Sequence, residues 1–587
     1  MQECEVSSAG ECNGRAQNPC RKLIEKLGRA ESRLIYSSLF FTNERGVGTG
    51  LGPDGAAFEM QKKFRLTVAV ALTFACVCVA AQQSAVTPLP STPKQPVVDE
   101  YHAVKVTDNY RWLEDGKNPQ VIAWTKAEDR HARALLDPLP LHTEIQQYLK
   151  KLLNQRSPSF YELTECHGLL FAMNSQPDQQ QDVLVTLRSP DDLTSKHIVV
   201  DPNQIDPTHS TAIQFYVPSG KVAVSLASGG TELGALHIYN AATGAALPDV
   251  VPRVSVGGGS VAWSADGSGL YYTRYPREGE RSPADLSFYE QVYYHKLGTP
   301  ATEDSYIIGK DFPRVAEISL TTNDDGRYLL ATVANGDGGT YEHLFRDPKG
   351  KWTRLTQFSD QVTAAVFGVD VLYMLSRNSA PRGKLVRVSL TNPDFATAQT
   401  VIPEPSAVLQ DFRFSLSVST PSYAITRTHL YVVELVGGPT EIHIFDHDGH
   451  ELGTVPAEPV SSVDQIVPLS DDNILFANVS WVDPRAWCVF DATSNKTTVT
   501  AMRETSTESF ADVEAVREYA ISKDGTRVPV NIIRRKGTKL DGENATVLKG
   551  YGGFDLSLSR RFAIANTPPA SSAGAANSPS SGTRLAC

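Results

Sequence analysis

The sequence lacks the features of disulfide-stabilised and nucleic-acid-binding proteins. It has 8 cysteines in 587 residues, and only Cys166, Cys488 and Cys587 follow residue 80. Three cysteines are too few for a disulfide framework, so the fold must depend on packing. The formal net charge is -11 and long runs of Lys or Arg do not occur. The composition therefore gives no support to a nucleic-acid partner or an anionic membrane surface.

The apolar run at residues 66–81 is short for a membrane-spanning helix, and basic residues precede it. Such a helix needs about 20 apolar residues, whereas a shorter run after basic residues and before small ones is typical of a secretory signal peptide. We expect a signal peptide over residues 60–81, beginning at Met60, that exports the protein without stable membrane insertion. A membrane anchor is the alternative. On this interpretation residues 1–59 are an upstream misread.

Helical patterns follow a Pro-rich lead-in. Asn118 and Pro119 form an N-cap followed by Pro at the first helical position, which predicts a helix from residue 119. The apolar positions of this helix and of a second one recur at helical spacing: Val121, Trp124 and Ala127, then Ile145, Tyr148, Leu149, Leu152 and Leu153. Thr143 and Gln146 suggest a capping box for the second helix. Both apolar faces need a partner.

Residues 165–505 consist of short β-rich runs separated by turn residues, without a convincing long helix. Turn, apolar strand, polar loop and second strand recur, as in the stretches at 219–247 and 324–350. At about 40 to 50 residues per four-stranded unit, this region holds about seven blades of a β-propeller. A propeller closes its series of sheets into a ring and leaves few exposed edges.

The pattern changes again near residue 506. Residues 516–537 predict a hairpin with Asp524 and Gly525 at its turn, and residues 545–550 predict a further strand that leads to Tyr551.

Five stretches, in this order, resemble the prolyl oligopeptidase family of serine peptidases. They are "TDNYRWLED" (107–115), "VAWSADGSGLYYTRYP" (261–276), "VYYHKLGT" (292–299), "ISKDGTRVPVNII" (521–533) and "YGGFDLSLS" (551–559). The resemblance implies an all-β seven-bladed β-propeller inserted into an α/β-hydrolase domain, which is incomplete in these 587 residues. It also implies hydrolysis of short peptides after proline by acyl-enzyme chemistry, with short proline-containing peptides as partners and no cofactor.

The resemblance and the composition together predict the order of segments. It is an unassigned segment (1–59), a signal peptide (60–81), a lead-in with the N-terminal helices of the peptidase domain (82–164), the propeller (165–505), the first hydrolase strands (506–562) and a low-complexity tail (563–587).

The resemblance assigns one catalytic role within these residues. The Tyr of the family's YGGF turn donates to the oxyanion through its phenol, and Tyr551 is the matching position. The Ser, Asp and His of the family's triad lie beyond that turn. The 587 residues contain no G-x-S-x-G, and 15 of the 21 residues from Thr567 to Cys587 are Ala, Ser, Pro or Gly. We interpret the tail as the product of a frameshift or assembly error, or as a true truncation, and expect this chain to be inactive alone.

Two alternatives follow. A non-catalytic propeller that binds peptides or a protein partner is the second functional hypothesis.

The run "HIFDHDGH" (443–450) gathers three His and two Asp and could suggest a metal. However, Asp448-Gly449 reads as a hairpin turn between two blade strands, as do Asp266-Gly267 and Asp325-Gly326, so we expect no metal. The sequence leaves the oligomeric state open.

Overall fold

A computed structural model of the chain describes residues 89–154, 157–254, 259–336, 339–410, 423–458, 460–506 and 509–548. The expected signal peptide, Tyr551 and the tail lie outside these residues. The chain divides into two compact units, one ending at Leu139 and the other beginning at Pro140. Of the helices within the described ranges, none has the length and apolar character needed to cross a membrane.

The first unit contains a hairpin and a helix. Strands β1 (Val97–Tyr101) and β2 (Val104–Asp108) pair, a short 3-10 turn follows at Arg111–Glu114, and helix α3 spans Pro119–Leu136. The predicted N-cap is confirmed, because the Asn118 side chain accepts a hydrogen bond from the Gln120 backbone N–H at 2.9 Å. Val121 is buried, and the Trp124 indole donates to the Thr92 hydroxyl at 3.0 Å.

The second unit opens with helix α4 (His142–Asn154). The helix already includes Thr143, so the predicted capping box is wrong: an N-cap residue must precede the first helical residue. Of the expected apolar stripe, Ile145, Tyr148 and Leu149 lie on this helix and are exposed, whereas the side chains of Leu152 and Leu153 lie outside the described part. The stripe thus lacks a packing partner within the described residues.

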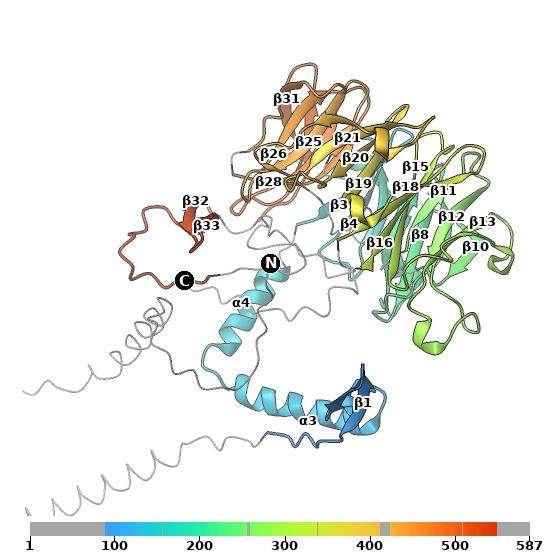
Figure 1. The fold of residues 1–587 in the computed structure, drawn as a ribbon. Coiled ribbons are helices and arrows are strands. Elements are labelled where there is room, and N and C mark those ends of the chain that lie inside the picture. Colours follow the sequence, from blue (N-terminus) through green and yellow to red (C-terminus); the bar gives the residue numbers. More distant parts are fainter. Residues whose placement is uncertain are drawn as a thin grey trace, which may run out of the picture. The chain divides into compact units, whose positions relative to one another are not determined.

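Seven antiparallel blades follow, six of four strands and one of five, and the predicted number of blades is confirmed. Figure 1 shows their arrangement. Their strands are β3 (Ser159–Cys166), β4 (Leu169–Ser175), β5 (Val183–Leu187) and β6 (His197–Val200) in blade 1; β7 (Thr211–Pro218), β8 (Lys221–Ser228), β9 (Ala235–Asn240) and β10 (Ala246–Pro252) in blade 2; β11 (Val261–Trp263), β12 (Gly269–Arg274), β13 (Gln291–Lys296) and β14 (Ser305–Ile308) in blade 3; and β15 (Ala316–Thr322), β16 (Leu329–Asn335), β17 (Tyr341–Arg346) and β18 (Trp352–Thr356) in blade 4.

The remaining strands are β19 (Val362–Phe367), β20 (Val371–Ser376), β21 (Lys384–Ser389) and β22 (Gln399–Ile402) in blade 5; β23 (Val408–Leu409) with β24 (Tyr423–Ile425), β25 (His429–Leu435), β26 (Thr440–Asp446) and β27 (Glu451–Thr454) in blade 6; and β28 (Ser462–Pro468), β29 (Ile474–Val479), β30 (Ala486–Asp491) and β31 (Lys496–Arg503) in blade 7. The only α-helix among the described blade residues is α5 (Pro202–Ile205). The blades begin at Ser159, earlier than the expected residue 165.

Each pair of neighbouring blades shares one buried apolar cluster, so seven clusters join seven blades. The inner strands are covered on both faces, and they are accordingly apolar almost throughout. Every residue of β5 and of β29 is buried, for example. The first strands of neighbouring blades lie next to one another, as β11 does with β15 and β28 with β3. The first strands therefore lie nearest the ring centre.

Among the described strands, none of blade 7 pairs with one of blade 1, so bonds and contacts that involve side chains close the ring there. We call this joint the seam. The Gln465 side chain accepts from the Leu163 N–H at 3.1 Å and donates to the Leu163 carbonyl at 2.7 Å. The Trp487 indole donates to the Phe160 carbonyl at 2.8 Å. Around these bonds lies an apolar cluster drawn from both blades.

A different polar joint links blade 2 to blade 3. His295 on β13 is fully buried, and its Nδ1 lies 2.7 Å from Asp304 while its Nε2 lies 3.2 Å from Asp249 on β10. The Tyr272 hydroxyl also donates to Asp304, at 2.6 Å. Burial lowers the pKa of His295, but the hydrogen bonds and charges of the two carboxylates outweigh it and leave the pKa raised.

After blade 7 the chain forms a hairpin of β32 (Val513–Ile521) and β33 (Arg527–Arg535). The predicted turn is confirmed, because Asp524 and Gly525 lie between the two strands. The strand predicted at 545–550 is wrong for its described part: residues 545–548 are not in a strand, and Val547 and Leu548 are exposed. A strand forms only beside a partner, and the described residues offer none there.

We predict that Gln465→Ala lowers the free energy of unfolding of the propeller by about 1 to 3 kcal/mol, because it leaves both backbone groups of Leu163 buried without partners. The urea midpoint measures the change. Gln147→Ala, at an exposed position of α4, is the control and should change stability by less than about 0.5 kcal/mol. Equal effects of the two substitutions would contradict the proposed importance of the seam.

We also predict that protonated His295 stabilises the fold. Its pKa is raised above the usual 6.5, so this stability is fully present below pH 6.5 and is lost as the pH rises through the folded-state pKa, with a slope of at most about 1.4 kcal/mol per pH unit. Urea midpoints measured across this range should fall in the wild type and stay flatter in His295→Gln. His450→Gln removes an exposed histidine that pairs with Asp446, and it should keep the wild-type slope. An unchanged slope in His295→Gln would refute the prediction.

Candidate functional site

The chain enters the propeller and leaves it at the same end. In a four-stranded antiparallel blade, the connections between strands two and three and those between successive blades lie at the same end. The chain enters the first strand of blade 1 and leaves the last strand of blade 7 at that end. The Thr505 N–H accordingly donates to the Ser157 hydroxyl at 2.8 Å. We call this end the terminus-bearing face.

The longest described connection on this face is the loop at residues 275–290 of blade 3. Two arginines from the adjoining connections hold it: Arg253 donates to the Leu286 carbonyl at 2.6 Å, and Arg314 donates to the Asp285 carboxylate at 3.1 Å. The Arg314 guanidinium also lies 3.5 Å from the centre of the Phe288 ring. The loop is thus fixed from blades 2 and 4.

Buried charges anchor the two ends of this loop. Arg274 is 4% exposed and binds both carboxylate oxygens of Glu280, at 2.7 and 2.9 Å. This bond is the main reason that the pKa of Glu280 is lowered. At the other end Glu290 is buried and accepts from the Ile318 N–H at 2.7 Å, while burial raises its pKa well above the usual value. These groups serve the loop's shape, because each has a partner within the protein.

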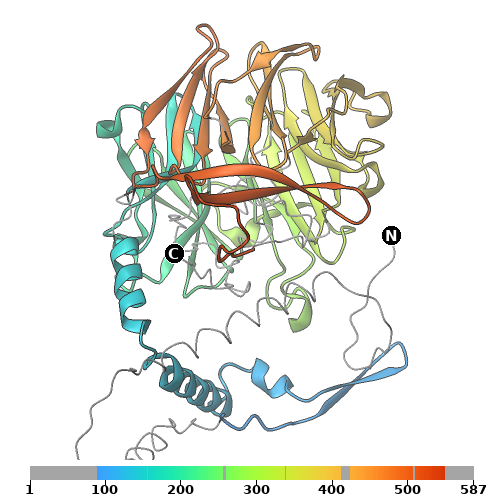
Figure 2. The ribbon, with the colours of Figure 1, turned by 90° about the vertical axis from the view of Figure 1, so that its left-hand side faces the viewer.

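The hairpin β32–β33 reaches the same face at blade 6 (Figure 2, red-orange). The Arg517 guanidinium donates to the Val436 carbonyl at 2.6 Å, in the turn between β25 and β26. Gly437 and Gly438 follow, with φ of +82° and +125°. A Cβ on Gly438 would lie 2.9 Å from Asn531 Nδ2 and 3.0 Å from Arg517 Nη2. Glycine at 438 therefore permits the hairpin to approach the propeller.

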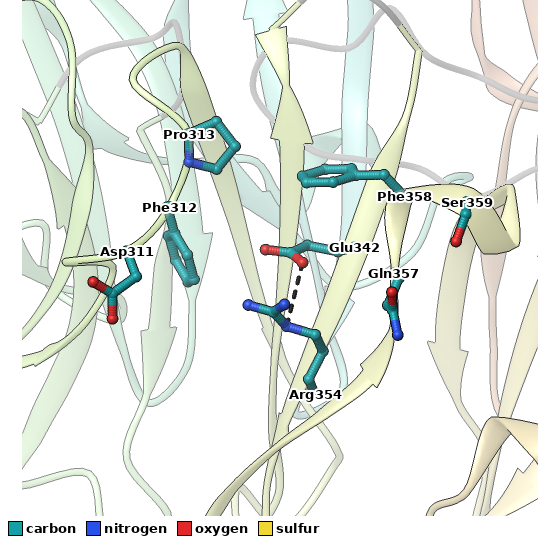
Figure 3. Close-up of a pocket in the computed structure, with 8 residues that line it drawn as sticks. All are labelled: Asp311, Phe312, Pro313, Glu342, Arg354, Gln357, Phe358 and Ser359. Atoms are coloured by element: carbon teal, nitrogen blue, oxygen red, sulfur yellow. Dashed lines mark ion pairs between the residues drawn. The ribbon is translucent and has the colours of Figure 1, made fainter.

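A cavity of about 480 Å³ opens at blade 4 on this face (Figure 3). Its lining comes from the connection before β15, from β17 and β18, and from the connection after β18: Asp311, Phe312, Pro313, Glu342, Arg354, Gln357, Phe358 and Ser359. Glu342 is 3% exposed, and its Oε2 lies 3.4 Å from Arg354 Nε. Burial raises the pKa of Glu342, and the charge of Arg354 opposes that shift.

The register explains how the pair meets. Leu344 lies opposite Arg354 across β17 and β18, and Glu342, two residues before Leu344, lies on the same face of the sheet. Glu342 and Arg354 are therefore diagonal neighbours. Sequence reasoning missed this site, although a signal was present: Glu342 is a charged residue in the otherwise strand-like stretch "TYEHLF" (340–345).

The residues singled out from the sequence have separate outcomes. Tyr551 lies outside the described residues, so its role remains a prediction. In "HIFDHDGH", Asp448 and Gly449 lie between β26 and β27, as expected for a hairpin turn. His443 lies 2.8 Å from Glu451, with longer contacts of 3.6 Å to Glu441 and 3.8 Å to Glu434. His450 lies 2.8 Å from Asp446, and His447 lies 3.1 Å from the Thr426 carbonyl. Asp266-Gly267 and Asp325-Gly326 likewise lie between paired strands.

Comparison with known proteins gives consistent matches. Residues 90–503 match the family profile "Prolyl oligopeptidase, N-terminal beta-propeller domain". The chain is 27% identical over 513 residues to a prolyl endopeptidase of Elizabethkingia meningoseptica, covering 86% of this chain and 69% of the relative. It is 23% identical over 509 residues to prolyl oligopeptidase A of Galerina marginata, covering 78% of this chain and 65% of the relative. The chain thus spans about two thirds of these relatives' length.

Two solved structures show the same fold. One comes from a structural and mechanistic analysis of two prolyl endopeptidases and superposes with a TM-score of 0.70 at 24% identity, covering 81% of this chain and 68% of that chain. The other is prolyl oligopeptidase B from Galerina marginata bound to a 35mer hydrolysis and macrocyclization substrate. Its TM-score is 0.69 at 21% identity, with 81% and 69% of the two chains covered.

We predict that Gly438→Ala loosens the hairpin from the propeller, because the new methyl group would meet Asn531 and Arg517 at about 3 Å. Amide exchange of β32 and β33 should become faster, while exchange within blades 1 to 5 stays unchanged. Gly437→Ala is the matched control: it also places a side chain at positive φ, but its Cβ has only ordinary contacts at 3.7 Å. Equal exchange in the two variants would show that the close approach at 438 does not hold the hairpin.

Proposed function

The chain belongs to the prolyl oligopeptidase family of serine peptidases, and from that premise we propose that the protein hydrolyses short peptides after proline by acyl-enzyme chemistry. The observation that carries the proposal is the terminus-bearing face. The chain enters and leaves the seven-bladed ring at this face. The hairpin β32–β33, which precedes Tyr551 in the sequence, contacts the same face through Arg517. A peptidase domain assembled from the segments flanking the propeller would adjoin this face.

Acyl transfer needs a nucleophile, a base that removes its proton, a carboxylate that orients the base, and donors for the developing oxyanion. In the proposed enzyme Tyr551 supplies one such donor through its phenol. The exposed apolar stripe of α4 supports an α/β-hydrolase partner, because Ile145 and Leu149 would gain cover from one. The propeller would restrict the peptides that reach the reacting groups to short ones.

The second candidate function is peptide binding without hydrolysis. It is favoured by one observation: the ring of seven blades is formed by residues 159–503 alone, as a separate binding module requires. The encoding DNA discriminates between the two. Reading it beyond codon 562 in all three frames should reveal a G-x-S-x-G if the gene encodes an enzyme, and none if the propeller is a binding module in its own right.

We further propose that the protein is exported through residues 60–81. The support is the sequence pattern described above, a basic stretch, a short apolar run and small residues. Sequencing the N-terminus of the protein purified from its native cells tests this, because a mature start within residues 1–59 would contradict it.

We predict that residues 60–587, expressed from Met60, do not hydrolyse a proline-containing chromogenic peptide above background. Without a nucleophile elbow, only substrate binding and a partial oxyanion site remain to accelerate the reaction. Release of the chromophore measures activity, and a prolyl endopeptidase of the same family serves as the positive control. Turnover that a serine-directed fluorophosphonate inhibits would show that the chain contains a nucleophile after all.

A further inference from the structure

The cavity at blade 4 contains a buried carboxylate with little to hold it. Glu342 is 3% exposed, yet within the described part of the chain its carboxylate forms no hydrogen bond, and its one ionic contact is the 3.4 Å approach of Arg354. The Arg354 side chain is itself 53% exposed. A buried carboxylate is costly unless donors replace the water that it has lost. Glu342 can therefore accept hydrogen bonds from donors that the described residues do not provide.

Two other buried charged groups on this face differ from Glu342. Glu290 accepts from the Ile318 N–H at 2.7 Å, and Arg274 is held by both oxygens of Glu280. Those groups stabilise the loop and need no ligand. Glu434, at the same end of blade 6, is also buried and has only a long contact, 3.8 Å to His443. Glu342 differs from it by lining the cavity (Figure 3).

The cavity walls favour a cation over an anion. Phe312 and Phe358 lie on either side of Glu342 in Figure 3, and the faces of aromatic rings attract positive charge. The lining includes two carboxylates, Asp311 and Glu342, against the single guanidinium of Arg354. Its formal charge is therefore negative even with the Glu342–Arg354 pair intact. Arg354 already places a cation beside Glu342, but its side chain is 53% exposed and contacts that carboxylate at 3.4 Å.

We propose that this cavity binds the cationic side chain of a lysine or arginine in a peptide. The ammonium or guanidinium donates to Glu342, and the methylene stem lies against Phe312 and Phe358. Arg354 competes for the same carboxylate and moves aside into solvent when the ligand enters. This inference rests on the proposed peptide-binding function and adds a preference for a basic residue, read on the propeller rather than by the catalytic groups.

Calorimetry on the full 587-residue chain tests the proposal with three peptides of equal length. They are acetyl-Ala-Lys-Pro-amide, its norleucine counterpart acetyl-Ala-Nle-Pro-amide, and acetyl-Ala-Lys-Ala-amide. The first should bind about tenfold more tightly than the norleucine peptide, as expected for one hydrogen bond to a charged group. Glu342→Gln keeps the shape of the side chain and should abolish this difference. Glu278→Gln, at an exposed position of the same face, should preserve it.

Arg354→Ala separates a cation site from an anion site. Removing the competing guanidinium should tighten binding of both lysine peptides, whereas a site for carboxylate ligands would lose its only cation. Thermal unfolding of each variant checks that it is folded.

The outcomes distinguish this inference from the proposed function. Equal binding of the lysine and norleucine peptides, unaffected by Glu342→Gln, would overturn the cation site and leave peptide binding intact. Equal binding of the Lys-Pro and Lys-Ala peptides, with Glu342 required, would support the cation site and remove the preference for proline. If no peptide binds, both proposals are wrong. Loss of lysine-peptide binding in Arg354→Ala would refute the cation site.

Discussion

The closure of the ring at the seam is the contact on which the rest of the structure depends. Within each blade, hydrogen bonds join strands that are close in sequence, and each joint between consecutive blades is likewise local. The seam instead joins residues far apart along the chain, Leu163 with Gln465 and Phe160 with Trp487, separated by 302 and 327 positions. Bringing such distant segments together costs chain entropy. The side-chain bonds and apolar contacts of the seam offset this cost. The paired hydrogen bonds of Gln465 fix the register in which blade 7 meets blade 1.

The seam also determines where function can be located. Because blades 1 and 7 meet, the positions where the chain enters and leaves the ring lie side by side. The segments before and after the propeller in the sequence can therefore contribute to one domain. The turn at Val436 and the loop at 275–290 project from that same face. A change in the angle between two blades would therefore alter the cavity at blade 4, since its lining residue Phe312 belongs to the apolar cluster between blades 3 and 4. Polar joints such as His295 with its two aspartates limit this freedom between blades 2 and 3.

The repeat period and the turn residues predicted the architecture well. Alternating apolar strands and Asp-Gly turns are local signals, and they indicated about seven blades as well as the hairpin at Asp524-Gly525. The Asn118 cap was predictable for the same reason. The capping box at Thr143 failed because the helix starts at His142, a boundary that a few side chains do not fix. The strand at 545–550 failed because strand formation requires a partner, and the Glu342 cavity was missed because its walls come from three separate segments.

Buried polar groups in a ring of apolar joints divide into those that serve the fold and those that do not. Gln465 and His295 lie in joints: Gln465 binds both backbone groups of Leu163 in the neighbouring blade, and His295 binds Asp249 of the neighbouring blade and Asp304 of its own. Their burial is compensated inside the protein, so their role is structural. Glu342 is as deeply buried but has only a long contact to a half-exposed arginine. The described residues offer Glu342 little compensation, so a ligand is its proposed source, and the negative, aromatic walls of the cavity favour a cation.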